Sequence, residues 1–276
     1  LYIANENNTL GIFNTGSAQA TVAGVSLTPG SGVVLAGDGV SGGQGDGGLV
    51  TATAVRVRFG APRGLVLSPQ GVLFVANRLR NTVRAINLGS SDVTIAGVPI
   101  PPGYIDRIAG QDDVAGSSGD NGSAINSLLD APSGLSLDSQ GILYISDLLN
   151  HRIRAVNTTA NTIIVAGVPV QGNYITTIAG TSAGYSGDGG PAIAARLYRP
   201  TANVILSSGV LVIADTDNGA LRAVNTKDSK VTFLGLTIEP GQIVTIAGTG
   251  SNGYDGENTP ALSSRMYHPR GLVFFP

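Results

Sequence analysis

The chain contains four similar copies of one long segment, and this repetition restricts its fold more than any other feature. Similar apolar runs end at Gly37, Gly110, Gly180 and Gly248, which follow one another at nearly equal intervals. A repeat of this kind is one structural unit that cannot bury its apolar face alone and therefore stacks against its neighbours. The sequence thus predicts an array of four similar modules.

Each repeat has a part of fixed length and a part of variable length. The distance from the opening proline to the closing glycine is identical in Pro62–Gly110, Pro132–Gly180 and Pro200–Gly248. The stretch from a closing glycine to the next proline changes from repeat to repeat, and it is longest between Gly37 and Pro62. Paired strands require a constant length, because a slip of one residue turns the core face of a strand outward. A surface connection tolerates a variable length.

The fixed part has the pattern of short β-strands. In the third repeat, Leu135, Leu137, Ile142 and Tyr144 follow the period of two that is typical of strands, and turn residues lie between the two pairs. Each repeat contains five strand-like runs. In the third repeat these runs are Gly134–Leu137, Leu143–Ser146, Ile153–Val156, Ile163–Val170 and Tyr174–Ala179.

Five antiparallel strands leave the chain on the face opposite to the one where it began. We therefore expect the variable connection to cross the sheet before the next repeat starts. The alternative is a four-stranded unit with an elongated last hairpin, in which the glycine-rich loop stays on the same face. Short helices at 123–129, 191–198 and 259–267 would accompany it, with Leu128, Leu197 and Met266 buried beneath them.

Antiparallel units of this kind must cover two faces and hide their edges, and radial closure achieves both. We therefore predict an all-β fold, a β-propeller of four long repeats, with residues 1–276 as a single domain. The N-terminal repeat lacks its first strand, and PRGLVFFP at 269–276 could supply it. We expect Leu272–Phe274 to pair antiparallel with Leu1–Ala4, or with the same strand of an adjacent molecule. The alternative is an excerpt of a longer or open array, and because the sequence begins without Met we expect a processed product or a piece of a longer chain.

Several motifs together resemble NHL repeats. They are LYISD (143–147), the following Asn150-His151-Arg152-Ile153-Arg154, the GYSGDGGPA run (184–192) and the TIAG endings. The resemblance implies a β-propeller, usually with shorter repeats and more blades than here. It also implies that enzymatic members, which are lyases, use clustered metal-binding histidines. His151 and His268 are the only histidines, and in a four-unit ring they would face each other, too far apart to share a metal.

Two recurring sets of charged residues are the candidate site. The set Arg84, Arg154 and Arg222 is either a ring of anion-binding groups or, as we favour, a set that pairs with nearby carboxylates or carbonyls. The set Asp46, Asp120, Asp188 and Asp255 lies in glycine-rich loops, where we expect the carboxylates to bond to loop N–H groups and to offer possible partner contacts. Calcium is a weak possibility, since it needs six to eight oxygen ligands; we expect no other cofactor and no catalytic or transition-metal site.

A third set follows the second strand of each repeat. Here we expect the side chains to accept from backbone N–H groups two residues further on, as in an Asx turn. The members are Asn5, Asn77, Asp147 and Asp215.

The composition narrows the function. A net charge of −2 gives no basic surface for nucleic acid, and no apolar run approaches the roughly 20 residues of a membrane helix. We therefore expect a non-enzymatic, extracellular or surface-exposed module that binds proteins or glycans or associates with itself. The alternatives are a lyase or hydrolase with its site at the channel mouth, and a sensor domain of a larger membrane protein.

Overall fold

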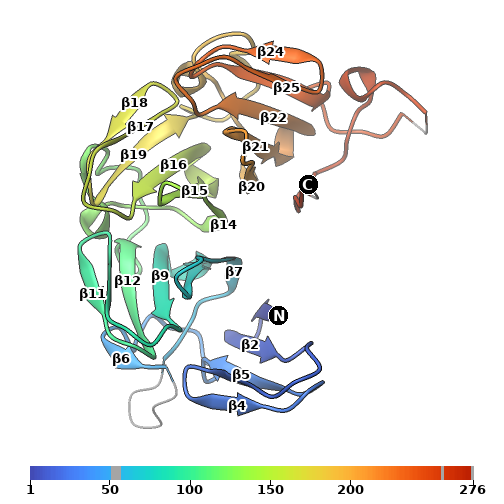
Figure 1. Ribbon diagram of the computed structural model, residues 1–276. Helices are drawn as coiled ribbons and strands as arrows, with labels where there is room; N and C mark the ends of the chain where they lie inside the picture. Colours follow the sequence, from blue (N-terminus) through green and yellow to red (C-terminus); the bar gives the residue numbers. More distant parts are fainter. Residues whose placement is uncertain (51–56, 256–257, 275–276) are drawn as a thin grey trace.

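The protein is built of four consecutive antiparallel sheets that lie side by side along an open arc (Figure 1). The computed structural model describes residues 1–50, 57–255 and 258–274. Within these residues the regular structure consists of strands and single 3₁₀ turns, as the all-β prediction requires. The predicted β-propeller architecture is confirmed, and we call each sheet with its inserted hairpin a blade.

Each complete blade is a four-stranded meander that runs from the centre of the arc outward. The pairing is antiparallel throughout; short turns join the first three strands, and a longer segment with an inserted hairpin joins the third strand to the fourth. The first blade has only three of these strands. From the inside outward the meanders are β1 (Tyr2–Asn5), β2 (Thr9–Phe13) and β5 (Gly32–Ala36); β7 (Pro62–Leu67), β8 (Val72–Asn77), β9 (Thr82–Asn87) and β12 (Tyr104–Gly110); β14 (Pro132–Leu137), β15 (Ile142–Asp147), β16 (Arg152–Asn157) and β19 (Tyr174–Ala179); and β20 (Pro200–Ile205), β21 (Val210–Asp215), β22 (Ala220–Asn225) and β25 (Ile243–Gly248).

The fourth of the five expected strands is a separate hairpin, so the prediction of a five-stranded meander is wrong. Residues 163–170 form β17 (Ile163–Val165) and β18 (Val168–Val170), which pair only with each other. The turn between them is Ala166-Gly167, with φ of 52° and 78°. Two successive positive φ values are typical of the two-residue hairpin turn that matches the twist of paired strands. Alanine seldom adopts a positive φ, so the sequence does not indicate a turn at this position.

The same inserted hairpin occurs in every blade, and in the second and third blades it reaches the blade that follows. The Ala166 N–H donates to the Thr226 carbonyl at 3.0 Å, and the Ala96 N–H donates to the Thr158 carbonyl at 3.5 Å. The hairpin tip therefore lies on the blade that follows in sequence. The other hairpins are β3 (Ala20–Val22) with β4 (Val25–Leu27), β10 (Val93–Ile95) with β11 (Val98–Ile100), and β23 (Val231–Phe233) with β24 (Leu236–Ile238).

The connections between blades are not cross-connections over a fifth strand, because a four-stranded meander already returns the chain to the correct face. They run to the outer edge of the next blade, where β6 (Gly48–Leu49) pairs with β12 and β13 (Gly122–Ser123) pairs with β19. The expected helices are single 3₁₀ turns. These turns are η2 (Ala124–Asn126), η4 (Ala192–Ala194) and η6 (Ala261–Ser263).

The burial expected beneath these turns is partly correct. Leu197 is fully buried, whereas its counterpart in the preceding connection is Leu129 and not Leu128, which is only half-buried, as is Met266. Leu129 and Leu197 occupy the same place in their connections, shortly after the turn.

The apolar core lies between the blades. Leu10 and Ile12 of the first blade pack with Leu73 and Val75 of the second. The same arrangement continues with Phe74 against Ile145 and with Tyr144 against Ile213. Each interface buries one face from each of two sheets, so a single repeat has no complete core of its own.

The closing glycines are required by the backbone. Gly110 has a φ of 79°, and a Cβ there would lie 2.1 Å from the Asn81 carbonyl oxygen. Gly248 meets the Gly219 carbonyl in the same way, at 2.2 Å. Both the φ value and the contact exclude a side chain, which explains why each fixed-length part ends in glycine.

The expected pairing of Leu272–Phe274 with Leu1–Ala4 is not formed among the described residues. β1 pairs only with β2, and residues 272–274 carry no strand. The C-terminal segment instead docks beside the fourth blade, where the Pro269 carbonyl accepts from the Thr216 hydroxyl at 2.7 Å and Leu272 packs against the core of that blade. The segment thus remains with its sequence neighbour, and the termini lie on opposite sides of the opening in the arc (Figure 1).

We expect Leu234→Asn to stabilise the protein by about 1 kcal/mol, because Asn adopts the left-handed conformation at lower cost. Leu234 has a φ of 51° at the turn of β23 and β24 and is 70% exposed, so little packing is lost. Urea unfolding measures the difference. Thr232→Asn, on the same hairpin but in an extended strand, should give no gain; an equal gain in both variants would contradict this explanation.

Candidate functional site

The three recurring arginines are buried, and each binds the connection that precedes its blade. Arg84, Arg154 and Arg222 are 1%, 0% and 0% exposed. Arg154 donates from Nη2 to Asp120 Oδ1 at 2.6 Å and from Nη1 to the Leu128 carbonyl at 2.8 Å. These guanidiniums face the protein interior and cannot act as an exposed anion-binding ring.

The structure brings three of the four predicted aspartates to these arginines. Arg84 donates from Nε to Asp46 Oδ1 at 2.7 Å, and Arg222 donates from Nη2 to Asp188 at 2.8 Å. The aspartates thus bond chiefly to guanidinium groups rather than to glycine N–H groups. Burial raises the pKa of the Asp46 carboxyl, an effect that the Arg84 charge opposes.

Asp255 differs from the other three aspartates. Its partner is Arg265, which lies a short distance further along the chain. Arg265 donates from Nε to Asp255 Oδ1 at 2.7 Å, and this pair lies on the exposed surface. The first blade has Gly11 at the position of the buried arginines, so it offers Asp255 no equivalent partner.

We expect Asp120→Asn to destabilise the protein by about 3 kcal/mol, because the Arg154 charge would remain buried without its counter-charge. Asp255→Asn is the matched control and should change stability little, since its pair is solvent-exposed. Urea denaturation of both variants provides the comparison. Equal losses would show that burial of the arginine does not decide the effect.

Three of the four residues expected to form Asx turns bind the incoming connection instead, so the prediction is wrong for these three; Asn5 donates from Nδ2 to the Thr9 hydroxyl. Asp147 Oδ1 accepts from the Asp130 N–H at 2.8 Å, and Asp215 Oδ1 accepts from the Tyr198 N–H at 2.7 Å. Asn77 accepts from a backbone N–H in the same way. The connection enters the innermost strand of each of these blades beside the last residue of that blade's second strand. The side chain of this last residue therefore lies next to a backbone N–H of the connection. Burial raises the pKa of Asp147 and of Asp215 to about 6.

The two histidines do not face each other across a ring, contrary to our expectation. His268 Nδ1 lies 3.0 Å from Asp217 Oδ1, and Asp217 also pairs with Arg199 at 3.5 Å. His151 Nδ1 accepts from the Arg199 N–H at 3.2 Å. Both histidines therefore lie beside the fourth blade, because the segment that carries His268 docks there. In the described part of the chain no three His, Cys, Asp or Glu side chains form a set that could hold a metal.

His151 occupies a position that the first and second blades fill with asparagine and the fourth with Gly219. Asn81 Oδ1 accepts from the Ala131 N–H at 3.0 Å and Asn8 Oδ1 accepts from the Ala61 N–H at 2.8 Å, as His151 does from Arg199. This contact joins one blade to the start of the next. Only an unprotonated Nδ1 can accept, and burial lowers the pKa of the His151 imidazole.

We expect His151→Asn to remove one source of acid sensitivity. Since the folded protein disfavours protonated His151, this group contributes stability above its ordinary pKa of about 6.5 and loses it as the pH falls. The free energy of unfolding of the variant should therefore exceed that of the parent protein by an amount that grows between pH 7 and pH 5. A difference that is constant with pH in urea titrations would contradict the proposed acceptor role.

The innermost strands and the C-terminal segment surround a central cavity of about 370 Å³. Three of its lining residues are Arg63, Arg78 and Arg270; the other lining residues are uncharged. The innermost strands β7 and β14 approach closely because the third residue of β7 is Gly64. A Cβ at Gly64 would lie 2.2 Å from the Ser133 carbonyl oxygen. The sequence analysis missed this cluster, since the arginines do not recur in all repeats. The available signal was the shared PRGL of residues 62–65 and 269–272.

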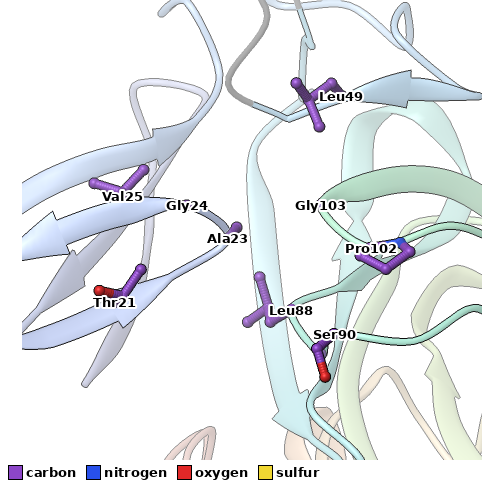
Figure 2. A pocket seen from close by; sticks show the side chains of 10 residues that line it. Thr21, Ala23, Gly24, Val25, Leu49, Leu88, Ser90, Pro102 and Gly103 are labelled. Carbon is purple, nitrogen blue, oxygen red and sulfur yellow. The ribbon is translucent and has the colours of Figure 1, made fainter.

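A second hollow of about 750 Å³ lies between the β3–β4 hairpin and the second blade (Figure 2). In Figure 2, Val25, Ala23 and Thr21 of the hairpin lie on one side and Leu88, Ser90 and Pro102 on the other. All of its lining residues are uncharged. It offers contact area and two hydroxyl groups but no charged group, so the central cavity is the better candidate site.

Comparison with known proteins identifies the class of fold. Residues 33–157 match the family model of the teneurin NHL domain. This segment runs from β5 through β16 and includes the whole second blade. The match supports the resemblance to NHL repeats for this part of the chain.

The individual relatives are distant. The chain is 26% identical over 192 residues to Protein SUPPRESSOR OF QUENCHING 1, chloroplastic, from Arabidopsis thaliana, and the match covers 67% of the chain but 16% of that protein. A structural genomics protein of unknown function from Bacteroides thetaiotaomicron superimposes with a TM-score of 0.50 at 16% identity, over 77% of this chain and 41% of that one. A streptogramin B lyase structure has a TM-score of 0.40 at 9% identity, over 81% of this chain and 50% of that one. The chain thus spans a small part of its curated relative and less than half of the first of these structures, which shows the fold alone.

Proposed function

We propose that the protein is a non-enzymatic binding module, extracellular or cell-surface, whose ligand docks at the central cavity. The observation that carries this proposal is the make-up of the cavity wall: arginine, leucine, serine, threonine and small residues line it, and among the described residues no carboxylate or imidazole does. General acid–base chemistry requires such groups within reach of the substrate. The wall is therefore suited to holding a ligand rather than to transforming it.

The two histidines do not favour the enzyme alternative. His151 uses Nδ1 to join two blades, and His268 uses Nδ1 to contact Asp217. Proteins and glycans are the proposed partners, and further copies of the chain are a third possibility. Among the described residues no helix has the length and apolarity needed to cross a membrane.

The proposal is tested with a variant that fills the cavity. A Cβ at Gly271 would meet no atom within 4 Å, so Gly271→Phe places an aromatic ring in the cavity without a clash at its base. We expect a ligand found on glycan and peptide arrays to bind this variant at least about tenfold more weakly, equivalent to about 1.4 kcal/mol.

Thr232→Phe is the matched control, because it adds the same ring on the exposed face of the outer hairpin. It should bind as the parent protein does. Unchanged binding by folded Gly271→Phe, or turnover of the bound ligand, would contradict the proposal.

A further inference from the structure

We infer that the central cavity recognises an anionic group, a carboxylate or a phosphate, which Arg63, Arg78 and Arg270 hold together. This inference rests on the proposed function, since it names the chemistry of the ligand at the same cavity. It goes further because it assigns three residues a shared role that the repeat pattern does not predict.

The three arginines come from segments that are far apart in the sequence. Arg63 and Arg270 each follow the proline that opens an innermost strand or its counterpart, at 62 and 269, and Arg78 begins η1 (Arg78–Arg80) at the end of β8. All three line the same cavity of about 370 Å³. At the position of Arg63 and Arg270 the third and fourth blades carry Ser133 and Thr201, so the positive charge of the cavity wall comes from the second blade and the C-terminal segment.

The cluster has more positive than negative charge. Glu6 pairs with Arg63 at 3.0 Å, but in the described part of the chain the Arg78 and Arg270 guanidiniums form no ion pair or hydrogen bond. Partial burial and repulsion by the neighbouring Arg63 and Arg270 charges lower the pKa of Arg78, an effect that the Glu6 charge opposes. Such repulsion costs folding free energy and is relieved when an anion enters.

The remaining wall defines the kind of ligand. Guanidinium groups present planar pairs of donors that match the two oxygens of a carboxylate or phosphate. Leu65, Leu135 and Leu272 contribute apolar surface, and Ser133 and Thr201 contribute hydroxyl groups. The volume lies near the lower end of the usual range for small-molecule pockets, roughly 300–1,000 Å³. We therefore expect one small anionic group with a short apolar portion, as an acidic sugar or an acidic side chain carries.

Calorimetric titration at low ionic strength tests the inference with inorganic phosphate, glutarate and the neutral analogue 1,5-pentanediol. We expect saturable binding of at least one anion and none of the diol, with the stronger anion showing whether phosphate or carboxylate is preferred. Arg78→Gln combined with Arg270→Gln should weaken anion binding at least tenfold. Glu6→Gln should strengthen it several-fold, because it removes the nearest negative charge.

Lys230→Gln is the matched control, since it removes one positive charge from the exposed end of the outer hairpin. It should leave anion binding unchanged. No saturable anion binding, equal losses in Lys230→Gln and the arginine variant, or no response to the arginine variant would overturn the inference.

The same measurements separate this inference from the proposed function. If an array ligand no longer binds Gly271→Phe but binds the arginine and Glu6 variants as it binds the parent protein, the proposed binding function is supported and the anion site is refuted. Conversely, anion binding that follows the charge variants, with no array ligand sensitive to Gly271→Phe, supports the anion site and refutes the proposed function.

Discussion

The buried ion pair between a blade's third strand and the preceding connection is the interaction on which the arrangement of the blades depends. A guanidinium removed from water is costly unless its donors are satisfied, so each arginine fixes the position of a carboxylate and nearby carbonyls at once. Arg84 does this with Asp46 and with the Arg58 carbonyl at 2.8 Å. The loop of variable length is thereby held at a point of constant geometry, and the next blade starts in the correct place.

The sequence predicted the repeat architecture well because strand pairing leaves a record in constant spacing. The fixed distance from opening proline to closing glycine and the closing glycines themselves both follow from backbone geometry, which tolerates no insertion and no side chain at Gly110. The inserted hairpin was mistaken for a strand since its turn carries Ala166, whose positive φ is stabilised by tertiary contact rather than by local preference. Pairing of the two termini within one chain is not formed for a related reason: local docking of Leu272 against the fourth blade, which no pattern in the sequence reveals, holds the segment in place.

The candidate site was less predictable than the fold. Arg84, Arg154 and Arg222 were selected because they recur in successive repeats. Residues that recur in this way serve the structure of each blade, and here they form buried ion pairs. A binding site in a repeat protein resides where the copies differ. Arg63, Arg78 and Arg270 depart from the Ser, Thr and Leu of other blades, and their convergence became visible only when the strands were placed around the cavity.

The overlapping hairpins give the array a direction. The hairpin of the second blade rests on the third, and that of the third blade rests on the fourth, through Ala96 and Ala166. Removal of a blade from the C-terminal side would leave the hairpin before it without its hydrogen-bond acceptor, whereas removal from the N-terminal side would leave the later contacts intact. The contacts broken at each interface are the same from either end, but the newly exposed face differs: loss of a C-terminal blade exposes a hairpin tip with an unpaired N–H, and loss of an N-terminal blade exposes an unpaired carbonyl.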